Sequence, residues 1–194
     1  MQNRDVAIRF NSVNGQLSNL PIRICLLLSL ILCIYQAGRR GIGDWYFRQS
    51  SPDSIQAAIQ WDGDNAQYYD ALGTITHFYA ASPNLDESVK FLESATRLSP
   101  LDANYWSDLG ATYDWAGQTN DAVAAFRRAL RLFPNSPEIN WRFANFAFRL
   151  HRIPEALRAL QVVLAGSSPS RRDVFRLAAN ATRDDRAIDR KSVV

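Results

Sequence analysis

The residues of this chain that could do acid–base, nucleophilic or metal chemistry do not form a recognisable catalytic or metal-binding motif. Its two histidines, His77 and His151, lie far apart in the sequence, and neither belongs to a metal-ligand motif. Its two cysteines, Cys25 and Cys33, are too few for a disulfide framework and lack the spacing of a metal site. The sequence contains no glycine-rich phosphate loop and no G-x-S-x-G nucleophile motif. We therefore expect no catalytic residue, no metal site, no cofactor and no enzymatic activity.

Composition and charge narrow the possible partners. The hydrophobic content of 47% is enough for the core of one domain and a tail. Residues 44–120 contain eleven acidic and three basic side chains, whereas residues 121–194 contain seven acidic and fourteen basic ones. A basic half could attract phosphates, but no nucleic-acid-binding motif accompanies the arginines and the acidic half opposes such binding. We expect neither a nucleic acid nor a small-molecule substrate.

An apolar stretch lies near the N-terminus. Residues 20–38 read LPIRICLLLSLILCIYQAG, which makes nineteen residues for a membrane span if Arg23 extends its charge to the interface. A helix needs about 20 residues to cross the hydrocarbon core. We therefore expect a single-pass anchor over 20–38. The alternatives are a cleaved signal peptide, for which Tyr35 and Gln36 occupy positions that require small residues, and a helix buried in the folded domain.

The orientation of this anchor is nearly balanced by charge. Arg4, Arg9 and Arg23 precede the uninterrupted apolar run over 24–37, and Arg39, Arg40 and Arg48 follow it, so the positive-inside rule gives a tie. A short N-terminal tail before a signal anchor favours the bulk of the chain lying outside the cytoplasm. Arginine outnumbers lysine twenty to two, which is typical of a GC-rich bacterial coding sequence. We expect a bacterial inner-membrane protein.

A pattern of small and bulky residues recurs along the rest of the chain. Within 103–136 it reads W-x2-L-G-x2-Y, then A-x3-F, then P, and its members are Trp106, Leu109, Gly110, Tyr113, Ala122, Phe126, Ala129 and Pro134. This unit of 34 residues resembles the tetratricopeptide repeat (TPR) at every signature position. The resemblance implies an all-α fold in which helical hairpins stack into a superhelix.

The residue types of the pattern suit two closely packed antiparallel helices. Gly110 and Ala122 let the helices approach each other, and the bulky residues fill the seam beside them. Gly117 is expected to end the first helix in a left-handed conformation, and Asn120 to cap the next one. Leu72 and Gly73 lie 37 residues before their counterparts, which predicts three extra residues in the turn near 80–86.

The repeat spacing divides the chain. We expect an N-terminal tail over 1–19, the anchor over 20–38, a linker over 39–52, a repeat domain over 53–182 and a charged tail over 183–194. Within the repeat domain we expect a lone second helix as a half-repeat over 53–65, whole repeats over 66–102, 103–136 and 137–170, and a capping half-repeat over 171–182.

The resemblance also implies a place for a ligand, because the first helix of each repeat lines a concave face in this family. Carried over by the repeat spacing, the groove residues are Asp70, Thr74, His77, Ser107, Asp114, Trp115, Trp141, Asn145, Phe148 and Arg149. A partner segment is expected to place its positive end near Asp70 and Asp114. Alternatively, Trp115 and Trp141 fill the spaces between helices and the two aspartates are merely solvated.

Together these features predict a non-catalytic, membrane-anchored TPR scaffold that binds other proteins in a bacterial cell-envelope complex. One alternative is an accessory TPR domain of a membrane glycosyltransferase or of a polysaccharide polymerisation or export system, because the pattern stops halfway through a repeat. Another is a soluble cytoplasmic TPR adaptor whose apolar stretch is buried against the repeats.

Overall fold

The computed structural model describes residues 20–78, 84–166 and 179. In this part of the chain the regular elements are α-helices, and no strand occurs. The helices are α1 (Leu20–Phe47), α2 (Pro52–Trp61), α3 (Ala66–Phe78), α4 (Leu85–Leu98), α5 (Ala103–Trp115), α6 (Thr119–Leu132), α7 (Pro137–Arg149) and α8 (Ile153–Ala165). The all-α prediction is confirmed.

Several predicted segments lie outside the described residues. These are the N-terminal tail over 1–19, the capping half-repeat over 171–182 except for Ala179, and the charged tail over 183–194. Their predictions stay as they were made from the sequence.

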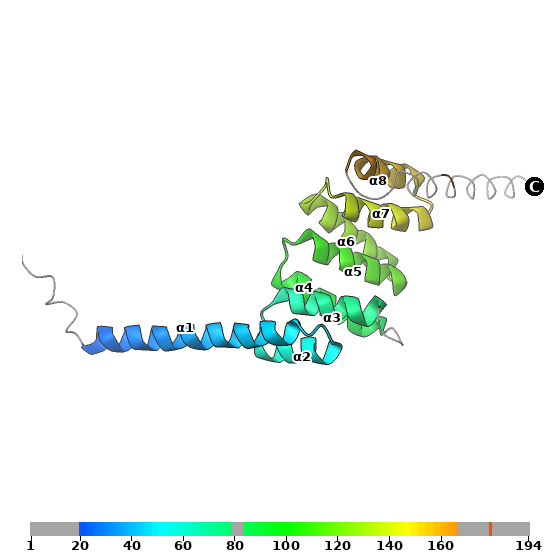
Figure 1. Cartoon of the computed structure of the whole chain (residues 1–194). Helices are drawn as coiled ribbons and strands as arrows, with labels where there is room; N and C mark the ends of the chain where they lie inside the picture. The colour runs from blue at the N-terminus through cyan, green and yellow to red at the C-terminus, as the bar shows by residue number, and fades with distance from the viewer. Residues whose placement is uncertain (1–19, 79–83, 167–178, 180–194) are drawn as a thin grey trace, which may run out of the picture.

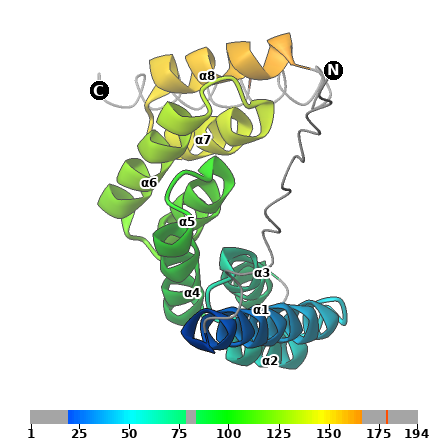
Figure 2. The same ribbon diagram turned by 90° about the vertical axis from the view of Figure 1, so that its left-hand side faces the viewer.

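The helices pack as successive hairpins. Each of α1, α3, α5 and α7 packs against the helix that follows it, and the hairpins join through contacts of α2 with α3, α4 with α5, and α6 with α7. Figures 1 and 2 show that the stack curves into an arc, with α3, α5 and α7 following one another on its inner side. We call the surface of these three helices the inner face.

Two glycines allow the helices of a hairpin to touch. A Cβ atom at Gly110 would lie 3.0 Å from Cδ2 of Phe126 on α6, and one at Gly73 would lie 2.7 Å from Cγ of Leu92 on α4. The hydroxyl of Ser88 donates a hydrogen bond of 2.7 Å to the carbonyl oxygen of Gly73. The side chains of Leu92 and Phe126 are almost fully buried as a result.

The turns between paired helices follow the sequence pattern with one exception. Gly117 lies in the turn after α5 and has a φ of +73°, which is in the left-handed region, as predicted. Six residues separate α3 from α4 but three separate α5 from α6, which confirms the predicted insertion. The prediction that Asn120 caps α6 is wrong: α6 already begins at Thr119, and Gln118 stands at the cap position without a side-chain cap bond. Because the turn after Gly117 is short, Asn120 is already the second residue of α6 and cannot occupy the cap position.

Helix α1 extends beyond the predicted anchor. Residues 39–47, which were expected to belong to a linker, are helical and pack against α2. Tyr46 and Phe47 join the cluster formed by Ile55, Ala58 and other residues of α2 and α3. The helix predicted to be alone over 53–61 therefore has the last turns of α1 as its hairpin partner.

The first part of α1 stands clear of the other helices (Figure 1). Among the described residues, Pro21–Phe47 is the one helical segment long and apolar enough to cross a membrane, and no part of its most apolar window is buried. The structure does not bury this stretch against the repeats, in contrast to the soluble-adaptor alternative.

Candidate partner-binding face

The predicted groove residues lie on the three helices of the inner face, but their exposure differs widely. Ser107, His77 and Phe148 are buried, with exposed fractions of 2%, 6% and 8%. Trp115 is 67% exposed and Arg149 is also exposed. The remaining predicted residues are half-buried: Asp70, Thr74, Asp114, Trp141 and Asn145.

An ion pair connects α5 and α7. Arg142 donates a hydrogen bond to the carboxylate of Asp108 and also lies 3.5 Å from the carboxylate of Glu138. The pair borders a cavity of about 120 Å³, which Ser107 also lines. Asp108 and Arg142 hold neighbouring hairpins together at this point.

Asp70 and Ser107 lie at equivalent positions of α3 and α5, next to this ion pair. The Oδ1 atom of Asp70 and the Oγ atom of Ser107 are buried, and neither has a hydrogen-bond partner among the described residues. A buried polar atom without a partner costs about 1–3 kcal/mol of stability. Native proteins leave few such atoms, so two in equivalent positions require an explanation.

The electrostatic surroundings of Asp70 are unusual for a carboxylate. Burial raises the pKa of Asp70, the negative charges of Asp108 and Asp102 raise it further, and Arg142 opposes them, which leaves this pKa at about 7. Burial also raises the pKa of Asp108, while Arg142 counteracts this. Because Arg142 is engaged by Asp108, no cation neutralises Asp70 directly in the described part of the chain.

Asp114 and Arg149, both predicted groove residues, form an ion pair with each other. The side chain of Asp114 is 14% exposed and that of Arg149 is 55% exposed. Asp114 is therefore already neutralised and offers no free negative charge to a ligand. Of the two carboxylates predicted to receive a positive group, Asp70 alone keeps an oxygen without a partner.

His77 is engaged by its neighbours in the interior. Its Nδ1 atom lies 3.0 Å from Oγ1 of Thr112, and its ring meets that of Trp115 edge-on with centroids 5.9 Å apart. Burial lowers the pKa of His77, which keeps the imidazole neutral near pH 7. Trp115 covers His77 with one part of its surface and exposes the rest.

The predicted residues of α7 are largely structural. Trp141 packs against the main cluster around Phe143 and Phe146 as a partly buried residue, and Phe148 belongs to that cluster. Asn145 donates a hydrogen bond of 2.8 Å to the carbonyl oxygen of Trp141 within the same helix. Trp141 thus makes the contacts between helices that the alternative interpretation of this residue predicts.

Two residues of the face were missed by sequence reasoning. Asp108 and Arg142 lie 34 residues apart, so they occupy the same position in successive repeats with opposite charge. A search for opposite charges at the repeat period could have found them. Over the described residues no group of three or more His, Cys, Asp or Glu side chains is arranged to hold a metal ion.

Comparison with known proteins identifies the repeat. Residues 116–181 match the sequence model of the tetratricopeptide repeat. Superkiller protein 3 of Schizosaccharomyces pombe is 32% identical over 82 residues, which are 42% of this chain and 6% of that protein. The chain thus spans a small part of the length of this relative.

Solved structures agree with the fold. A thermophilic TPR protein of Thermus thermophilus is similar with a TM-score of 0.58 and 22% identity, covering 68% of this chain and 71% of that one. YrrB, described as a TPR protein with an unusual peptide-binding site, is similar with a TM-score of 0.57 and 19% identity, covering 78% of this chain and 76% of that one. At such identities the likeness concerns the fold alone.

Proposed function

Because the chain is a tetratricopeptide-repeat protein, we propose that it is a non-catalytic scaffold whose inner face binds a segment of a partner protein. The observation that supports this most directly is the pair of buried polar atoms without partners, Oδ1 of Asp70 and Oγ of Ser107. Both atoms are closed to solvent in the free chain, so a bound segment would complete their hydrogen bonds after these side chains turn toward the inner face, and it would then recover the free energy that their burial costs.

The charge around Asp70 selects the chemistry of that segment. Asp70 is surrounded by the carboxylates of Asp102 and Asp108, and Arg142 is occupied by Asp108. A lysine or arginine side chain, or a group of N–H donors, is therefore the best complement. The exposed ring of Trp115 gives the same segment an apolar contact farther along the face, as aromatic residues often do in binding surfaces.

The same proposal includes anchoring by α1. The apolar window of α1 is unburied, and it continues directly into the first hairpin. Carbonate washing of membranes from cells that produce the full chain tests the anchor. Retention in the membrane pellet is expected, and complete release into the supernatant would contradict a membrane span.

We place the scaffold in a bacterial inner membrane, with the repeats outside the cytoplasm, as part of a cell-envelope assembly. The arginine-rich composition supports a bacterial source, and the apolar window of α1 supports the membrane. Fusions of alkaline phosphatase and of a cytoplasmic reporter to residue 194 test the orientation. Activity of the cytoplasmic reporter alone would put the repeats on the cytoplasmic side.

Binding can be tested with the full chain held in lipid nanodiscs. Peptides selected by display on this chain are expected to contain lysine or arginine, and their affinity is then measured by calorimetry. Asp70→Asn should weaken binding by at least about tenfold, because the charge that faces the cation is lost. Ser107→Ala should have a smaller effect in the same direction, since it removes one neutral hydrogen bond.

The matched control is Asp86→Asn, which removes a carboxylate from the exposed first turn of α4, away from the inner face. This variant should bind the selected peptides as the natural chain does. Affinity should also fall as the pH is lowered through about 7, because Asp70 becomes protonated there. Peptides that bind Asp70→Asn and the natural chain equally well would show that the segment binds elsewhere.

A further inference from the structure

The stalk formed by α1 is held firmly at its junction with the repeats. The guanidinium of Arg39 donates hydrogen bonds of 2.9 Å to Asp62 and to Asp64 in the turn between α2 and α3. The hydroxyl of Tyr68 on α3 donates one of 2.5 Å to Asp44 of α1. These contacts, with the packing of α1 on α2, set the direction of the stalk relative to the repeats.

One edge of the array faces along the stalk. Because consecutive helices are antiparallel, the turns that join one hairpin to the next all lie at the edge toward which the first part of α1 projects (Figure 1). We call this the stalk-side edge and define it as residues 61–65, 98–102 and 132–136. The described turns within hairpins, at 48–51, 116–118 and 150–152, lie at the opposite edge.

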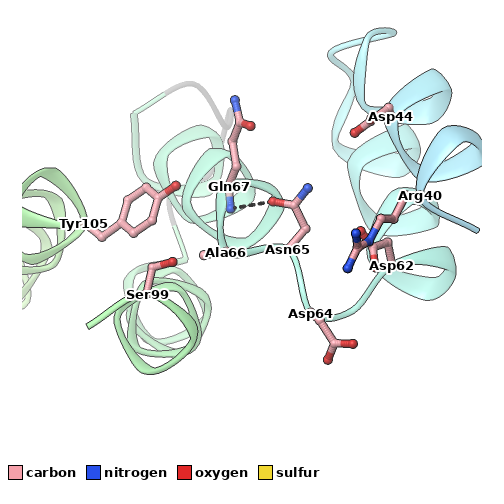
Figure 3. A pocket seen from close by; sticks show the side chains of 9 residues that line it. All are labelled: Arg40, Asp44, Asp62, Asp64, Asn65, Ala66, Gln67, Ser99 and Tyr105. Atoms are coloured by element: carbon pink, nitrogen blue, oxygen red, sulfur yellow. Dashed lines mark hydrogen bonds between the residues drawn. The ribbon is translucent and has the colours of Figure 1, made fainter. Parts of the chain in front are cut away.

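A polar cavity shows that two of these turns lie close to Arg40 of α1. A cavity of about 400 Å³ is lined by Arg40 of α1, by Asp64 and Asn65 of the α2–α3 turn, and by Ser99 of the α4–α5 turn. Figure 3 shows these side chains around one space, with Tyr105 on the far side. Two of the three turns of the stalk-side edge are thus close to α1 at Arg40.

Large apolar side chains are concentrated on the stalk-side edge. Trp61, Leu98, Leu101 and Phe133 lie there with exposed fractions of 45%, 37%, 75% and 54%. Among the described residues beyond α1, two further large apolar side chains, Trp115 and Leu157, are similarly exposed and lie elsewhere. Exposed apolar groups gathered on one edge are a feature of surfaces that meet a partner or a membrane.

The length of the stalk places a bilayer at this edge. Residues 21–38 of α1 extend about 27 Å at 1.5 Å per residue, close to the roughly 30 Å of the hydrocarbon core. The boundary of the core then falls near Arg39, which is level with the α2–α3 turn through its bonds to Asp62 and Asp64. Arginine and tryptophan side chains are common at this depth.

We propose that the stalk-side edge lies on the surface of the lipid bilayer that α1 enters, with Trp61 and Leu101 in its interfacial layer. This inference rests on the proposed anchoring by α1. Arg39 pairs with both Asp62 and Asp64 at the edge and offsets one of their two negative charges, and hydrated headgroups fill the polar cavity beside them. The array then runs along the membrane instead of pointing away from it, and the position of α1 determines which edge is hidden from soluble partners.

Depth measurements on the full chain in vesicles of phosphatidylcholine and phosphatidylglycerol test the inference. An environment-sensitive dye is attached to one cysteine at a time, with the other native cysteines replaced by serine. The positions are native Cys33 in α1, Leu101→Cys on the stalk-side edge and Gln118→Cys in the α5–α6 turn at the opposite edge. Quenching by lipids that carry a spin label near the headgroup is then compared.

The dye at Leu101→Cys should be quenched severalfold more than the dye at Gln118→Cys. Equal quenching at these two positions would overturn the inference while leaving the anchor intact, provided that the dye at Cys33 is quenched by spin labels placed deep in the acyl chains. A dye at Cys33 that escapes quenching would overturn the anchor and the inference together. Shielding of Leu101→Cys in native membranes but not in lipid vesicles would assign the edge to a protein partner and overturn it as well.

A second variant separates membrane contact from local effects of the dye. The double substitution Trp61→Gln and Phe133→Gln should reduce quenching at Leu101→Cys, because less apolar surface holds the edge on the lipid. Leu157→Gln, which changes an apolar residue that is 38% exposed on α8, is the matched control and should leave the quenching unchanged. A similar reduction by both variants would contradict contact through the stalk-side edge.

Discussion

Replacement of Asp70 by asparagine is expected to stabilise the repeats at neutral and alkaline pH. Burial and the charges of Asp108 and Asp102 raise the pKa of Asp70 from 3.8 to about 7. When the pKa of a carboxyl group is higher in the folded chain than in the unfolded chain, the group stabilises the fold most at a pH below its unfolded pKa. This stabilisation is lost as the pH rises through the folded value. The amide of the variant carries no charge, so it avoids that loss.

The magnitude follows from the surroundings of the carboxyl. The difference between 3.8 and about 7, at about 1.4 kcal/mol for each pH unit, sets an upper limit of about 4 kcal/mol. The attraction of Arg142 is already contained in the pKa of about 7, but Asp70 is only half-buried, so screening by water reduces the effect to about 1–2 kcal/mol. In a domain of this size such a gain raises the melting temperature by about 4–8 °C.

The assay is thermal unfolding of the full chain in detergent micelles, followed by circular dichroism between about pH 4 and pH 8. The melting temperatures of the natural chain and of Asp70→Asn should agree near pH 4 and separate as the pH rises. Asp86→Asn is the control and should be slightly less stable at the higher pH, because a carboxylate in the first turn favours α4. Near pH 8 the melting temperature of Asp70→Asn should exceed that of the natural chain. An equal or lower melting temperature would mean that the carboxyl of Asp70 is solvated or paired, and it would contradict our interpretation of the inner face.

Three further predictions concern the packing of the repeats, with urea unfolding as the measurement. Arg142→Ala should cost about 2–4 kcal/mol because it leaves Asp108 half-buried without its cation, and adding Asp108→Asn should recover part of the loss; an unchanged midpoint would mean that the pair is solvated. Gly110→Val should cost about 1–3 kcal/mol because its side chain would press on the ring of Phe126, so full stability would contradict the close helix contact. Gly117→Ala should cost about 1 kcal/mol because its φ of +73° strains any residue with a Cβ, and a gain in stability would show that the turn can adopt another conformation.

The stabilising effect of Asp70→Asn and its expected loss of binding belong together. A residue kept for function often lowers stability, because the groups that bind a ligand are poorly satisfied in its absence. If Asp70→Asn is more stable than the natural chain and also binds the selected basic peptides more weakly, both results would indicate that Asp70 is a binding residue. A purely structural carboxyl would change stability alone.

Much of the fold could be predicted because the contacts that form it are local in sequence. Gly110 faces Phe126 across a single hairpin, and both belong to one unit of 34 residues. The same holds for Gly73 and Leu92 in the hairpin before it. Small and bulky residues at helical spacing therefore determine the helices, their pairing and the length of the repeat. The apolar composition of residues 20–38 likewise identifies α1 without reference to any other part of the chain.

The end of α1 and the character of the inner face depend on contacts between residues far apart in the sequence. Residues 39–47 carry no repeat signature, and they form part of a hairpin because Tyr46 and Phe47 pack on α2 and α3 while Arg39 binds Asp62 in the turn between these helices. The pairing of Asp114 with Arg149 and the burial of Asp70 depend on how neighbouring hairpins are placed against each other. The sequence alone determined the helices that carry the repeat pattern and the positions that are equivalent in successive repeats. Only the tertiary structure decided which polar groups satisfy one another there and which have no hydrogen-bond partner among the described residues, because side-chain distances between repeats follow from the curvature of the stack.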